Sequence, residues 1–214
     1  MKETESLLYI LEMIGTIAFA SSGAMVGIRK NMDIFGVSVL AITTAVGGGM
    51  IRDILLGITP PGVFIHKVYV VAAVATACLL FIIVYHRKEI MESRFIEKYE
   101  KTMVMLDAVG LGIFTILGMN TAIQSGFEDN IFLVMFVGVV TGIGGGMMRD
   151  IMAGMTPFVF VRHIYACASI FGAVCYIMTR SLLDQRTAII ISVSVVVIIR
   201  ILAARFEWNL PRIK

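Results

Sequence analysis

Charged residues are scarce in this sequence: they make up 15% of its 214 residues, against about a quarter in an average soluble domain. Hydrophobic residues make up 58%, where about half is usual. A soluble domain of this size cannot bury such a surplus, so lipid must surround much of the surface. The formal net charge is only +3 and no long basic run is present, which argues against nucleic acid as a partner.

The sequence signatures of common enzymes are also missing. No Gly-Lys-Ser/Thr follows a glycine-rich stretch, which excludes a nucleotide-binding P-loop, and there is neither a nucleophile elbow nor a His/Glu zinc pattern. The three cysteines lie in apolar stretches without metal-ligand spacing, a pattern typical of buried free thiols. We therefore expect no enzymatic activity and no cofactor.

Long apolar runs dominate what is present, and a helix needs about 20 such residues to cross a bilayer. Seven runs qualify, over residues 7–28, 34–56, 64–85, 102–123, 131–153, 158–178 and 188–204. We predict an all-α membrane protein, with one transmembrane domain of seven helices over residues 1–214. The charged stretch 86–101 is the one long connection, and we expect a surface helix there.

The distribution of lysine and arginine predicts the orientation, because cytoplasmic loops of membrane proteins carry an excess of both. If the N-terminus is outside, the inner loops and C-terminus hold most of the basic residues: Arg29, Lys30, Arg87, Lys88, Arg94, Lys98, Lys101, Arg162, Arg205, Arg212 and Lys214. The outer connections are less basic and include the acidic pair Glu128 and Asp129. We therefore predict an outer N-terminus and a cytoplasmic C-terminus.

The chain contains an internal repeat. Residues 47–54 read GGGMIRDI and residues 144–151 read GGGMMRDI, and upstream Glu12 matches Asp107 at a similar offset. Three predicted helices precede the second copy, so the second copy crosses the membrane in the opposite sense. Inverted repeats of this kind bind or conduct solutes near the repeat interface. We place repeat one at 7–85, a linker at 86–101, repeat two at 102–178 and an extra helix at 188–204.

The two glycine triplets, Gly47 to Gly49 and Gly144 to Gly146, lie within predicted membrane helices. Each glycine costs up to about 1 kcal/mol of helix propensity relative to alanine, so we expect a kink or a short unwound turn. Carbonyls freed there must be paired or face water, and they can coordinate a monovalent cation. The predicted carbonyls are those of Gly47, Gly48, Gly144 and Gly145. The alternative is close helix packing through small residues.

An arginine–aspartate pair follows each triplet: Arg52 with Asp53, and Arg149 with Asp150. A charge at mid-bilayer costs at least about 2.5 kcal/mol, so such residues face a cavity or a partner. Neighbouring residues on a helix point about 100° apart, and we therefore predict crossed pairs, Arg52 with Asp150 and Arg149 with Asp53. The alternative is a structural ion-pair network at the helix ends.

Hydroxyl groups near the triplets are further candidates for an ion pathway: Ser21 and Ser22 in the first helix, and Thr44 and Thr141 just before the triplets. They can serve a permeating ion, or they can bond to another helix or to their own i−4 carbonyls. Glu12 and Asp107 begin matched helices, where a carboxylate can line a pore mouth or simply complement the helix dipole.

Residues 19–23 (FASSG), residues 44–53 (TAVGGGMIRD) and their counterparts in the second repeat resemble the bacterial trimeric intracellular cation (TRIC) channel family, some members of which are labelled glycine transporters. The resemblance covers nearly the whole chain. It implies a multi-pass protein of the bacterial inner membrane that forms a homotrimer in the lipid bilayer, with one pore in each subunit. It also implies seven helices, with the second and fifth kinked at the triplets.

The resemblance implies permeation of potassium and sodium ions. The pore elements would be Gly47 to Gly49, Arg52 and Asp53, with Gly144 to Gly146, Arg149 and Asp150. A monovalent cation channel with its pore between the two repeats is therefore our leading expectation. The alternatives are a secondary transporter of a small zwitterion such as glycine, and a non-transporting structural protein.

Overall fold

A computed structural model of the chain describes residues 2–86, 93–161, 164–206 and 208, and these residues form helices and connections without a strand. The helices are α1 (Lys2–Arg29), α2 (Ile34–Leu55), α3 (Gly62–Ile65), α4 (Val68–His86), α5 (Ser93–Ala122), the π-helical turn η2 (Ile123–Phe127), α6 (Ile131–Met152), α7 (Phe158–Val161), α8 (Tyr165–Arg180) and α9 (Gln185–Arg205). Six of them are long and apolar enough to cross a membrane, and α8 is a shorter apolar helix. The predicted all-α membrane fold is confirmed; where seven spans were predicted, the described residues hold six such helices and the shorter α8.

Three predicted segments differ from the helices observed. The run 64–85 is divided between α3 and α4, and the run 158–178 between α7 and α8. A proline precedes each short helix, at 61 and 157, and sets where that helix begins; the division between α3 and α4 itself falls at His66 and Lys67. The predicted linker helix lies partly outside the described residues, and from Ser93 onward it belongs to α5.

The central helices α2 and α6 begin and end in the same way. Asp33 accepts a hydrogen bond from the Gly36 N–H at 2.7 Å, and Asn130 accepts one from the Leu133 N–H at 3.0 Å, so a side chain caps the N-terminus of each helix. Beyond the C-termini, Gly57 and Gly154 adopt left-handed φ values of 69° and 65°. Glycine adopts this conformation without a Cβ penalty, and the chain leaves both helices by the same turn.

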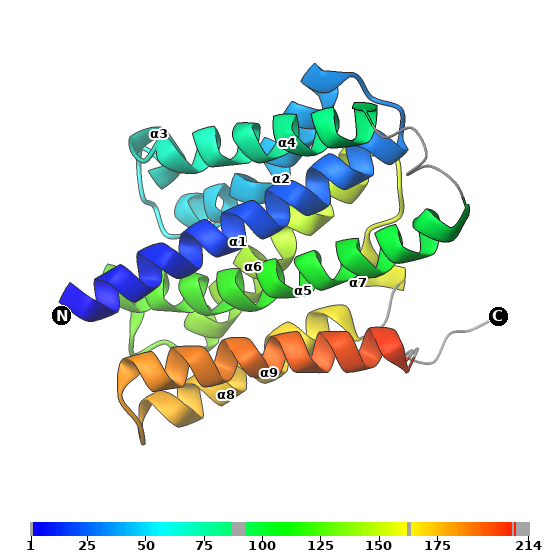
Figure 1. Ribbon diagram of the computed structural model, residues 1–214. Coiled ribbons are helices and arrows are strands. Elements are labelled where there is room, and N and C mark those ends of the chain that lie inside the picture. Colours follow the sequence, from blue (N-terminus) through cyan, green and yellow to red (C-terminus); the bar gives the residue numbers. More distant parts are fainter. Residues whose placement is uncertain (1, 87–92, 162–163, 207, 209–214) are drawn as a thin grey trace.

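Helices α2 and α6 pack against each other at the centre of the bundle, α1 packs on α2 and α4, and α5 packs on α6 and α9. Figure 1 shows α1 and α5 side by side and running in opposite directions, with α4 beyond α1 and the α8–α9 pair beyond α5. Two groups of helices therefore meet along α1, α2, α5 and α6. The repeat boundaries given above stay a prediction.

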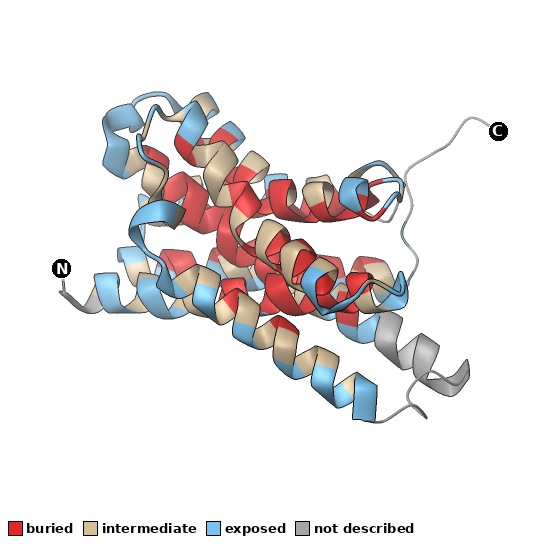
Figure 2. Ribbon diagram, turned by 90° about the horizontal axis from the view of Figure 1, so that it is seen from above, coloured by how far each residue is buried: buried red, intermediate tan, exposed pale blue. Residues whose placement is uncertain are grey.

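Burial separates a protein-facing centre from an outer surface. Figure 2 shows buried residues gathered in the middle of the bundle and exposed residues along its outer helices and ends. In the most apolar window of α5, 72% of the residues are buried, whereas the value for α4 is 11%. Because α4 also exposes large apolar side chains such as Val71, Leu79 and Ile82, its outer face suits contact with lipid.

Candidate functional site

The glycine triplets form the contact between α2 and α6. Both helices run uninterrupted through their triplets, so the predicted unwound turn is wrong, while the alternative of a kink stays a prediction. A Cβ atom on Gly48 would overlap the Thr141 carbonyl oxygen, and one on Gly145 would overlap the Thr44 carbonyl oxygen. The middle glycines therefore let two backbones approach closely, as small residues do between membrane helices.

Cation coordination by the backbone of Gly47, Gly48, Gly144 and Gly145 stays a prediction, and it would use carbonyls that lie within continuous helices. The last glycine of each triplet has different surroundings in the first half of the chain, which holds repeat one, and in the second half, which holds repeat two. A Cβ on Gly49 would have no neighbour closer than the Arg52 Nη2 at 3.8 Å, whereas one on Gly146 would lie 2.9 Å from the Tyr165 hydroxyl. The triplet is thus open in the first half and enclosed in the second.

The predicted hydroxyl groups take two different roles. Thr44 and Thr141 are buried, and each donates to a carbonyl of its own helix four residues earlier, Leu40 and Val137 respectively, at 2.6 Å. Ser21 and Ser22 are buried in α1. Ser22 accepts a hydrogen bond from the Arg149 guanidinium and so joins α1 to α6.

In the first half, the arginine and the aspartate of the motif pair with each other. Arg52 donates from Nε to the Asp53 Oδ1 at 2.8 Å, and the Asp53 Oδ2 accepts from the Gly62 N–H at 2.7 Å. The predicted crossed pair with Asp150 is therefore wrong. The flexible arginine side chain turns back towards its neighbour, which the angle between adjacent Cβ atoms does not prevent.

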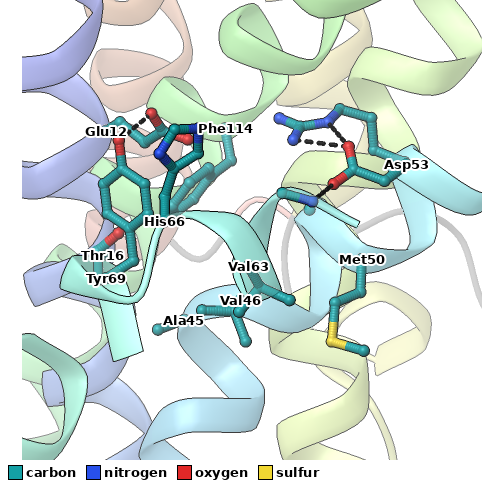
Figure 3. Close-up of a pocket in the computed structure, with 13 residues that line it drawn as sticks. Glu12, Thr16, Ala45, Val46, Met50, Asp53, Val63, His66, Tyr69 and Phe114 are labelled. Carbon is teal, nitrogen blue, oxygen red and sulfur yellow. Dashed lines mark hydrogen bonds and ion pairs between the residues drawn. The ribbon is translucent and has the colours of Figure 1, made fainter. Parts of the chain in front are cut away.

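A cavity of about 80 Å³ opens beside this pair. Its polar lining consists of Thr16 and of five titratable residues, Glu12, Arg52, Asp53, His66 and Tyr69, and Tyr69 donates its hydroxyl to Glu12. Figure 3 shows Glu12 and Tyr69 on one side of the cavity and Asp53 on the other, with His66 close to the Glu12–Tyr69 pair. Two carboxylates and one guanidinium line the same space, so these three groups carry a net charge of −1 when ionised. We call these five residues the first polar cluster.

In the second half, the matched residues are sealed from solvent. The Arg149 guanidinium donates to the Asp150 Oδ1 at 2.8 Å and to the Asp107 Oδ1 at 2.6 Å. The Asp150 Oδ2 accepts from the Phe158 N–H at 2.8 Å, and the Phe158 ring covers the guanidinium at 5.0 Å from its centroid. The predicted crossed pair with Asp53 is wrong here too, and the alternative of an ion-pair network at the helix end describes this site.

A buried arginine outside the repeated motif joins the second site. Arg200 of α9 is 1% exposed, and its guanidinium lies over the Tyr165 ring at 4.5 Å from the centroid. Its Nε and Nη1 have no hydrogen-bond partner. The net charge is zero for the four ionised residues Arg149, Arg200, Asp107 and Asp150. We call these four residues, together with Tyr165, the second polar cluster. Sequence reasoning missed Arg200, although a single basic residue within the apolar stretch of α9 was a usable signal.

Among the described residues, no group of three or more His, Cys, Asp or Glu side chains is arranged to hold a metal ion. The three cysteines are free and partly buried. What the site offers is polar and charged groups inside apolar helices, on both sides of a close backbone contact.

Comparison with known proteins identifies the family. A family model described as "Glycine transporter" matches residues 9–85 and 104–181. The solved structure of a prokaryotic TRIC channel in 0.5 M KCl matches with a TM-score of 0.85 and 32% identity, over 96% of this chain and 100% of that one. The chain belongs to the TRIC family. The resemblance inferred from the doubled motif is thereby confirmed.

Other TRIC relatives agree with this membership. The TRIC trimeric intracellular cation channel orthologue from Rhodobacter sphaeroides has a TM-score of 0.82 and 30% identity, over 94% of this chain and 99% of that one. The UPF0126 inner membrane protein YadS of Escherichia coli K12 is 34% identical over 96% of this chain and 95% of its own length. The TRIC fold therefore extends over nearly the whole chain.

Proposed function

We propose that this TRIC protein is a monovalent cation channel that passes potassium and also sodium ions. The observation that carries the proposal is the first polar cluster. Glu12 and Asp53 bring two carboxylates to a cavity inside membrane helices, against the single guanidinium of Arg52. A cavity with excess negative charge and low-dielectric walls raises the local concentration of cations.

The proposed pathway leads from this cavity to the α2–α6 contact and on towards the second polar cluster. At the contact, Gly48 meets the Thr141 backbone and Gly145 meets the Thr44 backbone without intervening side chains. A small separation of α2 from α6 would open a passage lined by carbonyls and by the Thr44 and Thr141 hydroxyls. The remaining predicted residues, including Ser21, Ser22, Arg149 and Asp150, belong to the far side of this passage.

The wider assembly is part of the proposal. The Rhodobacter sphaeroides relative is described as trimeric and as a cation channel, and YadS as an inner membrane protein. We extend both descriptions to this chain: a homotrimer in the bacterial inner membrane, with one pore in each subunit. The proposed orientation is the one that the basic residues predict, with the N-terminus outside and the C-terminus in the cytoplasm.

Planar bilayers test the channel. Purified protein under a potassium gradient is expected to give unitary currents that reverse near the potassium potential, and a sodium gradient is expected to give currents of the same kind. Glu12→Gln should lower the unitary conductance, because it removes the unpaired charge of the cavity. Glu128→Gln, which removes an exposed carboxylate from the α5–α6 connection, is the matched control. Absence of unitary currents from a folded trimer would contradict the proposal.

A second candidate function is secondary transport of a small zwitterion such as glycine. The favouring observation is that opposite charges line one cavity of about 80 Å³, with a guanidinium to hold a carboxylate and the carboxylates of Glu12 and Asp53 to hold an ammonium group. Saturable glycine uptake into proteoliposomes, without unitary currents in bilayers, would support this carrier and contradict the channel.

A further inference from the structure

A second hollow lies outside the two polar clusters, where α1 joins α2 and α4 ends. It has a volume of about 260 Å³ and is lined by Ile28, Asn31, Met32, Phe81, Val84 and Tyr85. Apart from one amide and one phenol hydroxyl, these side chains are apolar. We call this hollow the α1–α4 groove. Its lining suits a hydrocarbon chain better than an ion.

The α1–α4 groove lies at a membrane boundary. The apolar spans of α1 and α4 end at Arg29 and His86, beside the groove. Phe81 and Tyr85 stack with ring centroids 6.4 Å apart, and Tyr85 meets His86 edge-on at 5.7 Å. Aromatic rings with one polar end are enriched at the level of lipid headgroups. The groove is therefore at the depth where an acyl chain meets its phosphate.

The rim of the groove is basic. Arg29 and Lys30 are exposed in the connection after α1, and His86 is exposed at the end of α4. The acidic residue on this connection, Asp33, is engaged as the N-cap of α2. A ligand that fits both the lining and the rim has an apolar chain and a negative head.

The matched place in the second half has the opposite character. There the α5–α6 connection carries Glu128 and Asp129, and Arg180 in the last turn of α8 pairs with Glu128 at 2.6 Å. Helix ends that are matched in the repeat thus present acids where the first half presents lysine and arginine. The basic rim is specific to one side of the membrane and does not follow from the repeat itself.

We propose that the α1–α4 groove binds an anionic phospholipid, with one acyl chain along Met32, Phe81 and Val84 and the phosphate beside Lys30. The apolar lining supplies burial for the chain, and the basic rim selects the headgroup charge. Under the orientation predicted from the sequence, this site faces the cytoplasmic leaflet, whose anionic lipids attract basic segments next to the membrane. The proposal does not depend on what the protein transports.

The test is lipid retention by the purified full-length protein, measured by native mass spectrometry after exchange into mixed phosphatidylglycerol and phosphatidylcholine. The wild type should retain phosphatidylglycerol selectively. Lys30→Gln should weaken this retention about fivefold, the factor that corresponds to about 1 kcal/mol for one basic residue near an anionic surface. Lys67→Gln, an exposed lysine at the opposite end of α4, is the matched control and should change nothing.

Two groove-filling variants separate the groove from the charge alone. Val84→Trp fills the groove from α4, and Met32→Trp fills it from the α1–α2 connection. Two variants are used so that the test stands if one of them does not fold. Either folded variant should release phosphatidylglycerol although Lys30 is still present. Equal retention of both lipids by the wild type would overturn the proposal. So would full retention by a folded groove-filling variant, because the lipid would then be held without the groove.

Discussion

The two polar clusters carry the same motif in different surroundings. They differ in how far solvent reaches the arginine, and this difference shows which site is open and which is mainly structural. The Arg52 side chain is 13% exposed and faces a cavity, whereas the Arg149 side chain is completely buried among its partners. Both arginines pair with the following aspartate at 2.8 Å. The pairing is therefore common to the two halves, and solvent access is what distinguishes them.

One difference in side-chain size accounts for much of this contrast. Asp53 accepts its backbone hydrogen bond from Gly62, and Asp150 accepts the equivalent bond from Phe158. The Phe158 ring covers the Arg149 guanidinium, and glycine has no ring to cover Arg52. The second half adds Arg200, which brings a further positive charge that the first polar cluster lacks.

The largest effect should come from removing each arginine in turn. Arg149→Met leaves Asp107 and Asp150 buried without their partner and should destabilise the protein by about 3–5 kcal/mol. Arg52→Met exposes Asp53 to a cavity and should cost clearly less. Thermal unfolding in detergent, followed by size-exclusion chromatography, measures both. Equal losses of stability would show that the two clusters do not differ as described.

Alanine at the central glycines should affect both halves equally. Gly48→Ala and Gly145→Ala each drive a methyl group into a backbone carbonyl, and overpacking of this kind costs about 1–3 kcal/mol. Gly49→Ala is the control, because its nearest neighbour would be 3.8 Å away. The same thermal assay applies. If Gly48→Ala and Gly145→Ala unfold at the temperature of Gly49→Ala, the α2–α6 contact is not as close as the structure has it.

Gly62→Phe should transfer the seal of the second half to the first with little effect on stability. A Cβ at this position is in ordinary contact with Asp53 at 3.4 Å, so the substitution fits the backbone. The ring should cover Arg52 and slow the thiol labelling of a Met50→Cys reporter, a partly exposed lining position of the cavity, in a protein whose three native cysteines are replaced. Gly62→Ala is the control and should leave labelling fast. Unchanged labelling in Gly62→Phe would mean that ring size is not what closes the second site.

The smallest effect concerns α9, which lies outside the residues that the family model matches. Asp184 caps it, and hydrogen bonds from the Thr187 hydroxyl and backbone N–H lower the pKa of this exposed carboxyl below its ordinary value. A lowered pKa in the folded state gives a stabilisation that is complete above the unfolded pKa of about 3.9 and is lost as the pH falls through the folded value.

The first turn of α9 should therefore stay equally protected from amide exchange between pH 8 and about pH 5. Its protection should fall only in stronger acid, where Asp184 becomes protonated and the helix start frays. Asp184→Asn keeps a capping oxygen without the titration and should abolish this acid dependence. Fraying at neutral pH in the wild type would contradict the assignment of Asp184 as the cap.

The sequence predicted the helices and the repeated motif well, because apolar runs and matched residues are local patterns. It failed on the side-chain partners of Arg52 and Arg149, since a long side chain can reach either its neighbour or another helix. It also could not show which half holds the cavity. That depends on Gly62 and Phe158, which lie beyond the motif and do not occupy matched positions: the offset that aligns Asp53 with Asp150 aligns Phe158 with Pro61.

The contribution of Arg200 from α9 has a consequence for biosynthesis. Asp107, Arg149 and Asp150 enter the membrane with α5 and α6, while Arg200 is translated 50 residues after Asp150. Until that last helix inserts, the second polar cluster carries an unbalanced negative charge and the Tyr165 ring lacks its cation. The first polar cluster has all five of its residues once Tyr69 of α4 is made, and its net charge does not change when the later helices are added. A chain without α9 would therefore leave the second polar cluster with a net charge of −1 and the Tyr165 ring without its cation.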